Sequence, residues 1–392
     1  MKKKLAIVTS HPIQYNAPWF RLLNEAGKVK PKVFYTWSQI QNVEKYDPGF
    51  GKKIFWDIPL LEGYDYCYVM NTSAEPGTHH FKGLVNPTLI AEIEAWKPDA
   101  ILVFGWAFHS HLCCLRYFHN KKPVLFRGDS TLLDEKRGVK TLLRRIFLKW
   151  VYSHIDIALY VGINNKKYFV IHGLNEDQLV YAPHAIDNIR FEDNEADLAI
   201  EAMEMRNQLG ISNNEVLLLF AGKLEDKKNP FFLIDLLDKN RNQHLNILFV
   251  GNGPLENSLK QKAAADKRIY FLDFQNQKIM PVIYRMADIF ILPSTGPGET
   301  WGLSLNEAMA CGKPVVATEK VGGAVDLIRT NINGIIIHAN NTTELELLLD
   351  RAFLDKKILY SMGMNSKKII QQFSFHQIIE TIDELMNKLS FA

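Results

Sequence analysis

Short apolar runs that alternate with longer amphipathic stretches constrain the fold of this chain more than any other feature. Runs that are apolar throughout and separated by helical patterns are typical of parallel strands whose sheet is covered on both faces. The candidate strands form two series, the first being Leu5–Val8, Lys32–Tyr35, Ala100–Phe104, Pro123–Phe126 and Ile157–Val161, and the second Val216–Phe220, Asn246–Val250, Ile269–Leu272, Ile289–Leu292, Pro314–Ala317 and Gly334–Ile337. Two series predict an α/β protein with two doubly wound, Rossmann-like domains.

The length of 392 residues also favours two domains, because it exceeds what a single hydrophobic core usually serves. Acidic, helix-forming sequence near residues 188–210 interrupts the rhythm of the strands. We therefore expect a first domain over residues 1–190 and a second over residues 205–372.

Composition and charge argue against several classes of protein. The net charge of +3 is too small to indicate nucleic-acid binding. The four cysteines lack metal-ligand spacing and are typical of buried thiols in a reducing compartment. The apolar run after the basic start MKKK is too short for a signal peptide, and no stretch approaches the length of a membrane span. We expect a cytoplasmic protein, unless it lies on the inner face of a membrane.

The segment GETWGLSLNE, residues 298–307, is the most informative candidate site. It follows the strand candidate Ile289–Leu292 and leads into a helical pattern, so that a turn with glycines precedes a helix start. The backbone N–H groups and the dipole at such a start favour a phosphate, and Glu299 and Glu307 can accept hydrogen bonds from sugar or ribose hydroxyls. Together they indicate a sugar nucleotide. The alternative is an ordinary strand–loop–helix unit in which a glutamate caps the helix.

Two further turns follow strand candidates of the second series, and the ends of parallel strands share one edge of a sheet. The first strand of that series leads into Gly222, Lys223 and Lys228, where a glycine admits a ligand close to the backbone and lysines can neutralise a diphosphate. The next strand leads into Gly251-Asn252-Gly253-Pro254. Each turn alone is also consistent with a solvated loop. Because both turns follow strands of the same series, we expect them to form one binding site at a single edge of the sheet.

Taken in order, these motifs resemble those of the retaining glycosyltransferases of family 4, which have the two-domain GT-B architecture. FAGKLEDKKNP is similar to the family's G-R/K-L…K-x-P segment, and VGNGPLENSLK to its G-x-G-P turn. FLDFQNQKIMPVIYRMADIFILPS resembles the stretch before the acidic motif, with Asp288, Pro293 and Ser294 in the usual places, and GETWGLSLNEAMACGKPVVAT resembles the E-x7-E segment itself. YAPHAIDNIRF and FSFHQIIETIDELMNKL are similar to the interdomain segment and the terminal helix. The likeness is good over residues 155–390 and weak over the first 150.

The resemblance implies two Rossmann-like domains that face each other across a cleft, with residues 373–392 forming a helix that crosses back onto the first. It also implies a donor site for a nucleotide-diphosphate sugar. Lys223 and Lys228 would hold the diphosphate, Glu307 the ribose hydroxyls and Glu299 the hydroxyls of the donor sugar. The expected donor-binding set is completed by Gly222, Asn252, Gly253, Trp301, Gly302, Leu303 and Ser304.

Transfer of a sugar breaks an anomeric C–O bond and leaves negative charge on the departing diphosphate. Two lysines and a helix N-terminus can stabilise that charge without a metal ion, and the sequence contains no convincing Asp-x-Asp motif. We therefore expect no metal, and no cofactor besides a UDP- or GDP-linked co-substrate. The resemblance implies retention of anomeric configuration, through front-face attack in which the leaving phosphate helps to remove the acceptor proton.

The first domain departs from the family pattern. Where many members carry a glycine-rich loop after the first strand, this chain has His11, Gln14 and Tyr15, which we assign to the acceptor side. Where many carry a histidine, Arg127 and Asp129 follow a strand. The arginine could pair with a phosphate or an acidic sugar, and the aspartate could act as an acceptor-side base or hydroxyl anchor. The alternative is an Arg–Asp pair that only shapes the loop.

Three histidines remain to be placed. His109 and His111 follow another strand end, and their two-residue spacing without a further ligand argues against a metal. Both are substrate-side candidates, and we assign His109 to the acceptor side. His184 lies in the hinge segment and is expected to pack there. The residue that replaces the family histidine stays open at this point, and we expect Glu299, Arg127 and Asp129 to lie nearest the chemistry.

Residues 136–152, KRGVKTLLRRIFLKWVY, are basic and apolar at helical spacing. Such a helix can lie on an anionic membrane surface, and the alternative is a core-facing helix with a solvated basic side.

The sequence therefore predicts a retaining hexosyltransferase that acts on a glycan or lipid-linked acceptor in cell-surface polysaccharide or glycoconjugate synthesis. Two alternatives stand beside it. A nucleotide-sugar epimerase of GT-B shape would release a changed sugar nucleotide without an acceptor. A non-catalytic sugar-nucleotide-binding subunit is suggested by the missing histidine.

Overall fold

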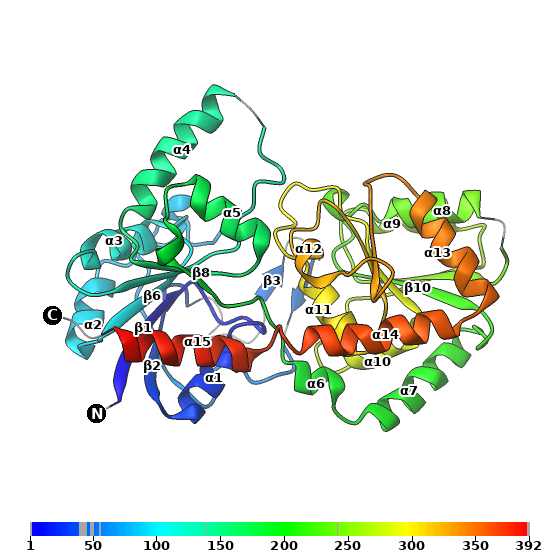
Figure 1. Ribbon diagram of the computed structural model, residues 1–392, viewed down its shortest axis with the longest axis horizontal. Helices are drawn as coiled ribbons and strands as arrows, with labels where there is room; N and C mark the ends of the chain where they lie inside the picture. Colours follow the sequence, from blue (N-terminus) through cyan, green and yellow to red (C-terminus); the bar gives the residue numbers. More distant parts are fainter. Residues whose placement is uncertain are drawn as a thin grey trace. The chain divides into compact units, whose positions relative to one another are not determined.

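The computed structural model describes residues 2–38, 45–47, 51–54, 56–136, 138–240 and 242–389. The chain divides into two compact units, each built around its own parallel sheet (Figure 1). The first unit consists of residues 1–45, 58–184 and 375–392, and the second of residues 46–57 and 185–374. The expected α/β class with two doubly wound sheets is confirmed.

The sheet of the first unit has seven strands in the order β5-β2-β1-β6-β7-β8-β9, and neighbouring strands run parallel. The strands are β1 (Lys3–Thr9), β2 (Val29–Tyr35), β5 (Asp65–Tyr68), β6 (Ala100–Phe104), β7 (Val124–Arg127), β8 (Ile157–Tyr160) and β9 (Leu179–Tyr181). The α-helices of this unit are α1 (Ala17–Ala26), α2 (Leu89–Trp96), α3 (His109–Phe118), α4 (Val139–Tyr152), α5 (Ile163–Ile171) and α15 (Phe375–Lys388). The central strands are apolar because helices cover both faces of the sheet.

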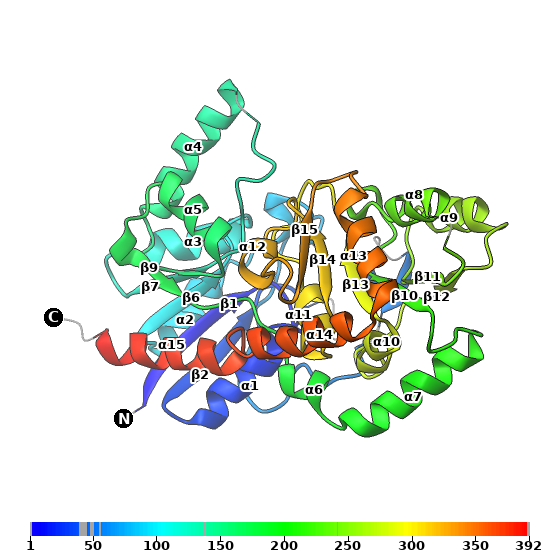
Figure 2. The same ribbon diagram turned by 45° about the vertical axis from the view of Figure 1, so that its right-hand side comes forward.

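The sheet of the second unit has six strands in the order β12-β11-β10-β13-β14-β15, again parallel (Figure 2). The strands are β10 (Val216–Ala221), β11 (Leu245–Val250), β12 (Ile269–Leu272), β13 (Ile289–Leu292), β14 (Val315–Thr318) and β15 (Gly334–Ile337). The α-helices are α6 (Asn188–Glu192), α7 (Glu195–Gln208), α8 (Phe231–Lys239), α9 (Glu256–Ala263), α10 (Met280–Met286), α11 (Leu303–Ala310), α12 (Ala324–Leu327), α13 (Thr343–Leu354) and α14 (Lys357–Ile370). The aliphatic side chains of β10, β11 and β13 are fully buried and form the centre of its core.

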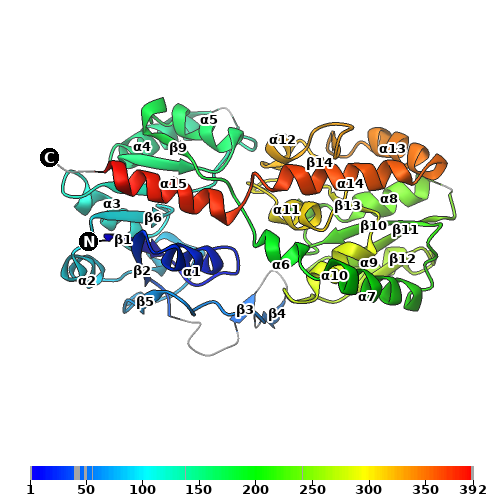
Figure 3. The ribbon, with the colours of Figure 1, turned by 60° about the horizontal axis from the view of Figure 1, so that its bottom comes forward.

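The last helix, α15, belongs to the first unit and lies beside α1 (Figure 3). Its apolar face is buried, and polar contacts hold it at its middle and at its C-terminal end. Lys3 Nζ donates to the carbonyl of Leu389 at 2.7 Å, and Thr381 Oγ1 donates to the carbonyl of Tyr181 at 3.1 Å. Residues more than 180 positions apart in the sequence are thereby joined in one unit.

A short excursion of the chain belongs to the second unit, although the sequence placed it inside the first domain. Residues 46–57 include part of the two-stranded sheet of β3 (Lys45–Asp47) and β4 (Lys52–Ile54). Trp56 makes an edge-to-face contact with Phe274, with the ring centroids 6.1 Å apart. The backbone N–H of Lys278 donates to the Asp57 carboxylate at 3.1 Å. No apolar strand pattern marks this excursion in the sequence.

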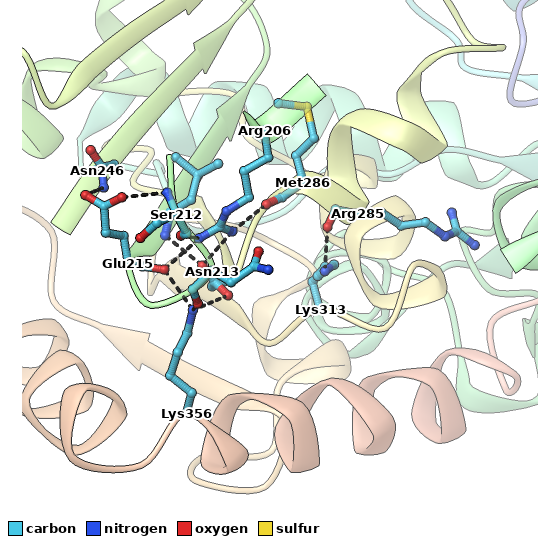
Figure 4. Close-up of polar contacts among 11 residues, drawn as sticks. Arg206, Ser212, Asn213, Glu215, Asn246, Arg285, Met286, Lys313 and Lys356 are labelled. Atoms are coloured by element: carbon cyan, nitrogen blue, oxygen red, sulfur yellow. Dashed lines mark hydrogen bonds and ion pairs between the residues drawn. The ribbon is translucent and has the colours of Figure 1, made fainter. Parts of the chain in front are cut away.

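A polar cluster around the buried Arg206 fixes α7 to the amino-terminal edge of the second sheet (Figure 4). Arg206 donates to the carbonyls of Ser212, Glu215 and Met286 at 2.6–3.1 Å. Its guanidinium also lies 2.9 Å from the Asp288 carboxylate, which accepts from the backbone N–H of Leu217 as well. Asp288, which the resemblance singled out, therefore joins elements of the scaffold at the edge opposite the glycine turns.

Candidate functional site

Each sheet reverses its strand order at one point, and in doubly wound sheets ligands bind beyond the carboxyl ends of the strands at that point. In the second unit the reversal lies between β10 and β13, and in the first between β1 and β6. The loop after β10 contains Lys223 and Lys228, and the loop after β13 contains Glu299. The topology therefore brings the predicted lysines and the first glutamate of the E-x7-E segment to one place.

Contacts between side chains confirm that these two loops meet. The Lys228 ammonium forms an ion pair with Glu299 Oε2, and Ser294 Oγ donates to the same oxygen at 3.1 Å. Ser294 and Glu299 are buried, whereas Lys228 keeps part of its surface exposed. A buried carboxylate held by an ammonium and a hydroxyl is fixed in place, and its oxygens can accept hydrogen bonds from ligand hydroxyls.

The backbone around Glu299 is held by the loop after β14. The N–H of Gly322 donates to the carbonyl of Glu299, and the N–H of Gly323 to the carbonyl of Trp301, each at 2.9 Å. The Thr318 hydroxyl donates to the carbonyl of Ser294. The loop that carries the glutamate is therefore supported along its length, which is how a rigid scaffold positions a binding residue.

The helix start predicted in this segment is present. Gly302 has φ +94°, and a Cβ at this position would lie 2.8 Å from methyl groups of Leu292 and Val321, so both the conformation and the space require glycine. Helix α11 begins at the next residue, and Leu303 and Ser304 are half-buried in its first turn. The N–H groups of a first helical turn have no partner four residues earlier, and they form an anion site together with the helix dipole.

Trp301 supports this turn from inside the protein. Its indole is buried, and Nε1 donates to Asn306 Oδ1 at 2.9 Å. The ring also lies 6.1 Å from the ring of Phe373. The structure therefore gives the Trp301 side chain a packing role, and leaves the backbone of residues 301–304 as the part that suits a phosphate.

The second glutamate of the segment is buried one turn into α11. Tyr284, on α10, donates its hydroxyl hydrogen to Glu307 Oε2 at 2.7 Å. Glu307 is four residues after Leu303 and three after Ser304, so its side chain lies on the same face of the helix as the first turn. Tyr284 was not among the predicted site residues, because nothing in its spacing links it to Glu307.

The glycines of the turn after β11 allow this turn to pack closely against the loop after β10. A Cβ on Gly251 would lie 2.1 Å from the carbonyl oxygen of Gly222, and one on Gly253 would lie 2.5 Å from that of Leu224. The Asn252 amide donates to Glu256 and Asp273 at 2.8 and 3.0 Å and accepts from the N–H of Phe274 at 2.9 Å. Asn252 and Gly253 thus brace the turn beside Gly222 and Lys223, and their predicted contact with a donor stays a prediction.

The acceptor-side candidates of the first unit follow β1 and β6, at the reversal of its sheet. His11 Nδ1 lies 2.9 Å from Ser10 Oγ, and its ring meets the ring of Trp37 edge-on at 5.3 Å. Gln14 and Tyr15 are half-buried in the turn before α1. His109, the first residue of α3, is half-buried, and its Nε2 lies 3.7 Å from Cys113 Sγ.

His111 is a core residue, and its interpretation as a substrate-side candidate was wrong. Its ring is fully buried, with Nδ1 2.8 Å from the carbonyl oxygen of Phe104 and Nε2 3.1 Å from Thr36 Oγ1. Burial lowers the pKa of His111 to about 4, so the ring is neutral at neutral pH. A helical spacing of two residues puts His109 and His111 on different sides of α3, one towards solvent and one into the core.

Arg127, at the end of β7, links the sheet of the first unit to the segment that follows β9. The guanidinium is buried and donates to the carbonyls of Ala182 and Pro183 at 2.9 and 2.8 Å. Burial lowers its pKa to about 10, which still leaves it charged at neutral pH. The structure favours the alternative in which Arg127 shapes the loop.

His184 lies directly beyond these carbonyls and pairs with the other catalytic candidate. Its Nε2 is 3.5 Å from Asp129 Oδ2, and Asp129 is partly exposed. Burial lowers the pKa of His184, and the neighbouring carboxylate opposes that shift. The sequence pattern predicted only a packing role for His184, and its contact with Asp129 is visible only in the folded structure.

No set of three or more His, Cys, Asp or Glu side chains within the described ranges is arranged to hold a metal ion. A helix long and apolar enough to cross a bilayer is also absent from that part of the chain.

Comparisons with known proteins agree with the geometry. Residues 201–369 match the family model "Glycosyl transferases group 1". The match spans the second unit from α7 to α14, and therefore includes the Lys228–Glu299 pair and Glu307.

Curated relatives are similar over the same region. An uncharacterized glycosyltransferase of Methanocaldococcus jannaschii is 28% identical over 189 residues, which are 47% of this chain and 48% of the relative. The UDP-Gal:alpha-D-GlcNAc-diphosphoundecaprenol alpha-1,3-galactosyltransferase of Escherichia coli is 27% identical over 186 residues, 45% of this chain and 46% of the relative. The matches cover about half the length of these relatives.

Solved structures are similar over the whole chain. A glycosyltransferase from Rickettsia africae has a TM-score of 0.75 at 18% identity, covering 99% of this chain and 98% of its own. Alr3699/HepE of Anabaena, in complex with UDP, has a TM-score of 0.74 at 20% identity, covering 98% of this chain and 100% of its own. The chain has the two-unit GT-B fold, and the comparisons support a glycosyltransferase.

Proposed function

We propose that the protein is a retaining glycosyltransferase that moves a hexose from a UDP- or GDP-linked sugar to a glycan or lipid-linked acceptor. In this proposal the second unit binds the donor and the first unit binds the acceptor. The observation that carries it is the Lys228–Glu299 pair beside the start of α11, at the reversal of the second sheet.

Each group at this site has a role in the proposed reaction. Lys223, Lys228 and the N–H groups of the first turn of α11 stabilise the negative charge that develops on the departing diphosphate, so the leaving group needs no metal ion. Glu299 accepts hydrogen bonds from hydroxyls of the donor sugar, and Glu307 from those of the ribose. When a donor binds, Lys228 exchanges part of its contact with Glu299 for the diphosphate.

Retention of configuration follows in this proposal from front-face attack, in which a leaving-phosphate oxygen accepts the proton of the acceptor hydroxyl. A double displacement would need a carboxylate nucleophile next to the anomeric carbon. The Glu299 carboxylate already contacts Lys228 and Ser294, and we therefore do not assign it as this nucleophile. Asp129 and His184 in the first unit are the groups that suit an acceptor-side base or anchor.

Two of the similar proteins support the donor and acceptor classes. The Anabaena protein binds UDP, and the E. coli relative transfers galactose from its UDP-linked form to a lipid-diphosphate acceptor. An acceptor of this kind lies at a membrane surface, and cell-surface polysaccharide or glycoconjugate synthesis is the process that uses it.

The test is a thermal-shift panel of nucleoside diphosphates and their sugars, with and without EDTA, followed by NMR of the product. A ligand at 100 times its Kd adds about 2.7 kcal/mol to the stability of the folded state. We expect one nucleotide to raise the Tm regardless of EDTA, and the product to keep the anomeric configuration of the donor. Conversion of the donor sugar without an acceptor would support an epimerase, and binding without turnover a non-catalytic subunit.

A further inference from the structure

Helix α4 of the first unit turns most of its large apolar side chains towards solvent. Six residues at positions 139, 142, 143, 146, 147 and 150 follow the spacing of one helix face. Val139, Leu143 and Ile146 are 75%, 61% and 60% exposed, and Leu142, Phe147 and Trp150 are exposed as well. We call these six residues the α4 face.

The C-terminal end of α4 is fixed by the core. Leu148, Val151 and Tyr152 are buried against the sheet of the first unit. Figures 1 and 2 show the rest of the helix extending away from that sheet. The α4 face therefore leaves unburied the kind of surface that a soluble domain usually covers.

Positive charge borders the α4 face on both sides. At 100° per residue, Lys140 and Lys149 lie roughly a quarter-turn to either side of its centre, and both are exposed. Residues 136–152 contain no carboxylate side chain. An apolar face between lysines, with a tryptophan at one end, matches the interfacial zone of a bilayer that contains anionic lipids.

The two arginines of α4 are occupied by the protein. Arg144 donates to the Tyr168 hydroxyl at 3.2 Å, and Arg145 lies 2.8 Å from the carboxylate of Glu135. The sequence pattern did not distinguish among the cations of residues 136–152. One of these cations, Arg137, lies outside the described residues. The structure separates the lysines, which border the apolar face, from the arginines, which hold the helix to its neighbours.

We propose that the α4 face docks the first unit onto an anionic membrane surface, with the six apolar side chains entering the headgroup region and Lys140 and Lys149 contacting lipid phosphates. The docking itself does not require catalysis. Its link to a lipid-linked acceptor rests on the proposed function, because the same unit would bind that acceptor. A second copy of the chain is the competing occupant, and the test separates the two.

The test is sedimentation with vesicles of phosphatidylcholine alone or mixed with phosphatidylglycerol. We expect the protein to bind the mixed vesicles at low salt and to be released in 1 M salt, where the Debye length falls to about 3 Å. Each lysine near an anionic surface is worth about 1 kcal/mol, so Lys140→Glu/Lys149→Glu should weaken partitioning about thirtyfold or more. Leu143→Ser/Ile146→Ser should weaken it on both kinds of vesicle.

Matched controls come from the second unit. Lys267→Glu/Lys368→Glu changes the net charge equally at exposed sites, and Leu347→Ser/Leu354→Ser removes two exposed leucines of α13. Both controls should bind vesicles like the unsubstituted protein. Equal losses in test and control variants, or no binding to phosphatidylglycerol vesicles at low salt, would overturn the proposal.

Two further measurements keep the outcome decisive. Vesicles with brominated lipid should quench tryptophan fluorescence in the unsubstituted protein, and Trp150→Phe should remove most of that quenching without altering the fold. Sedimentation equilibrium without lipid tests the competing occupant, and we expect no self-association through the α4 face. Self-association that Leu143→Ser/Ile146→Ser abolishes would assign the α4 face to a second copy. Nucleotide binding, measured on the same samples, shows whether a failure concerns docking or the proposed function.

Discussion

Lys228 and Glu299 form an ion pair that joins the loop after β10 to the loop after β13. These strands are neighbours in the sheet although about 70 residues separate them along the chain. The pair therefore places one cation and one carboxylate at the reversal of the strand order, where a charged ligand of a doubly wound sheet binds.

Replacing Lys228 by alanine should weaken binding of the nucleoside diphosphate. The lost contact is a charge-assisted hydrogen bond, worth about 1.5–3 kcal/mol, or roughly a 10- to 150-fold rise in Kd. Isothermal titration calorimetry measures this directly. Lys227→Ala is the matched control, because Lys227 is adjacent and pairs with Glu225 at 3.3 Å instead. Equal Kd values for the two variants would refute the diphosphate role of Lys228.

Replacing Tyr284 by phenylalanine should reduce both stability and donor affinity. The variant removes the hydroxyl that donates to the buried Glu307 carboxylate at 2.7 Å, and the loss of such a hydrogen bond costs about 1 kcal/mol. Urea unfolding and nucleotide titration measure the two effects. Tyr360→Phe, at an exposed position, should change neither. A loss of stability with an unchanged Kd would mean that Glu307 does not contact the ribose.

Replacing Arg127 by methionine should lower the free energy of unfolding by about 3 kcal/mol, because two backbone carbonyls lose a charged donor. Donor affinity should change little, since in the proposed function the donor binds to the second unit. Urea unfolding and nucleotide titration separate the two effects, with the exposed Arg116→Met as the control. Normal stability with a loss of turnover would restore Arg127 as a substrate contact.

His111 should make stability depend on pH in the acidic range. Its pKa is 6.5 as a free side chain and about 4 in the folded protein, because burial disfavours the charged ring. The unfolded chain therefore takes up a proton first as the pH falls. Stability is fully present above pH 6.5, and about 3 kcal/mol is lost between pH 6.5 and pH 4.

The pH effect of His111 is measured as a difference between variants. Urea unfolding between pH 7 and pH 4 should show a shallower pH dependence in His111→Asn than in the unsubstituted protein. Tyr360→Phe, at an exposed position, should leave the slope unchanged. The same slope in all three proteins would assign the acid sensitivity to other groups.

Replacing Arg206 by methionine should destabilise the second unit by about 3–5 kcal/mol. The change removes the donor to three carbonyls and one ion-pair partner of the Asp288 carboxylate, which keeps its ion pair with Lys356 at 3.1 Å. Urea unfolding should show one earlier transition for this unit. Arg329→Met, at an exposed site, should cost less than about 0.5 kcal/mol. A similar cost for both variants would mean that the cluster in Figure 4 contributes little.

The sequence by itself determined the parts of this protein that depend on local pattern. Apolar runs such as Ile289–Leu292 predicted the central strands, because a strand covered on both faces must be apolar throughout. The turn with glycines at residues 298–302, followed by a helical pattern, predicted a helix start, and α11 begins at Leu303. The edge strand β5 and the short β9 were missed, because strands that are less buried lack that continuous apolar pattern.

The tertiary structure decided which polar side chains meet. Tyr284 with Glu307, and Asp129 with His184, are joined by contacts between residues far apart in the chain, and no spacing in the sequence encodes them. It also decided that His111 and Arg127 are held by backbone groups and that the apolar side of α4 faces outward. Periodicity fixes the face on which a residue lies, whereas the partner of that face depends on how distant segments pack.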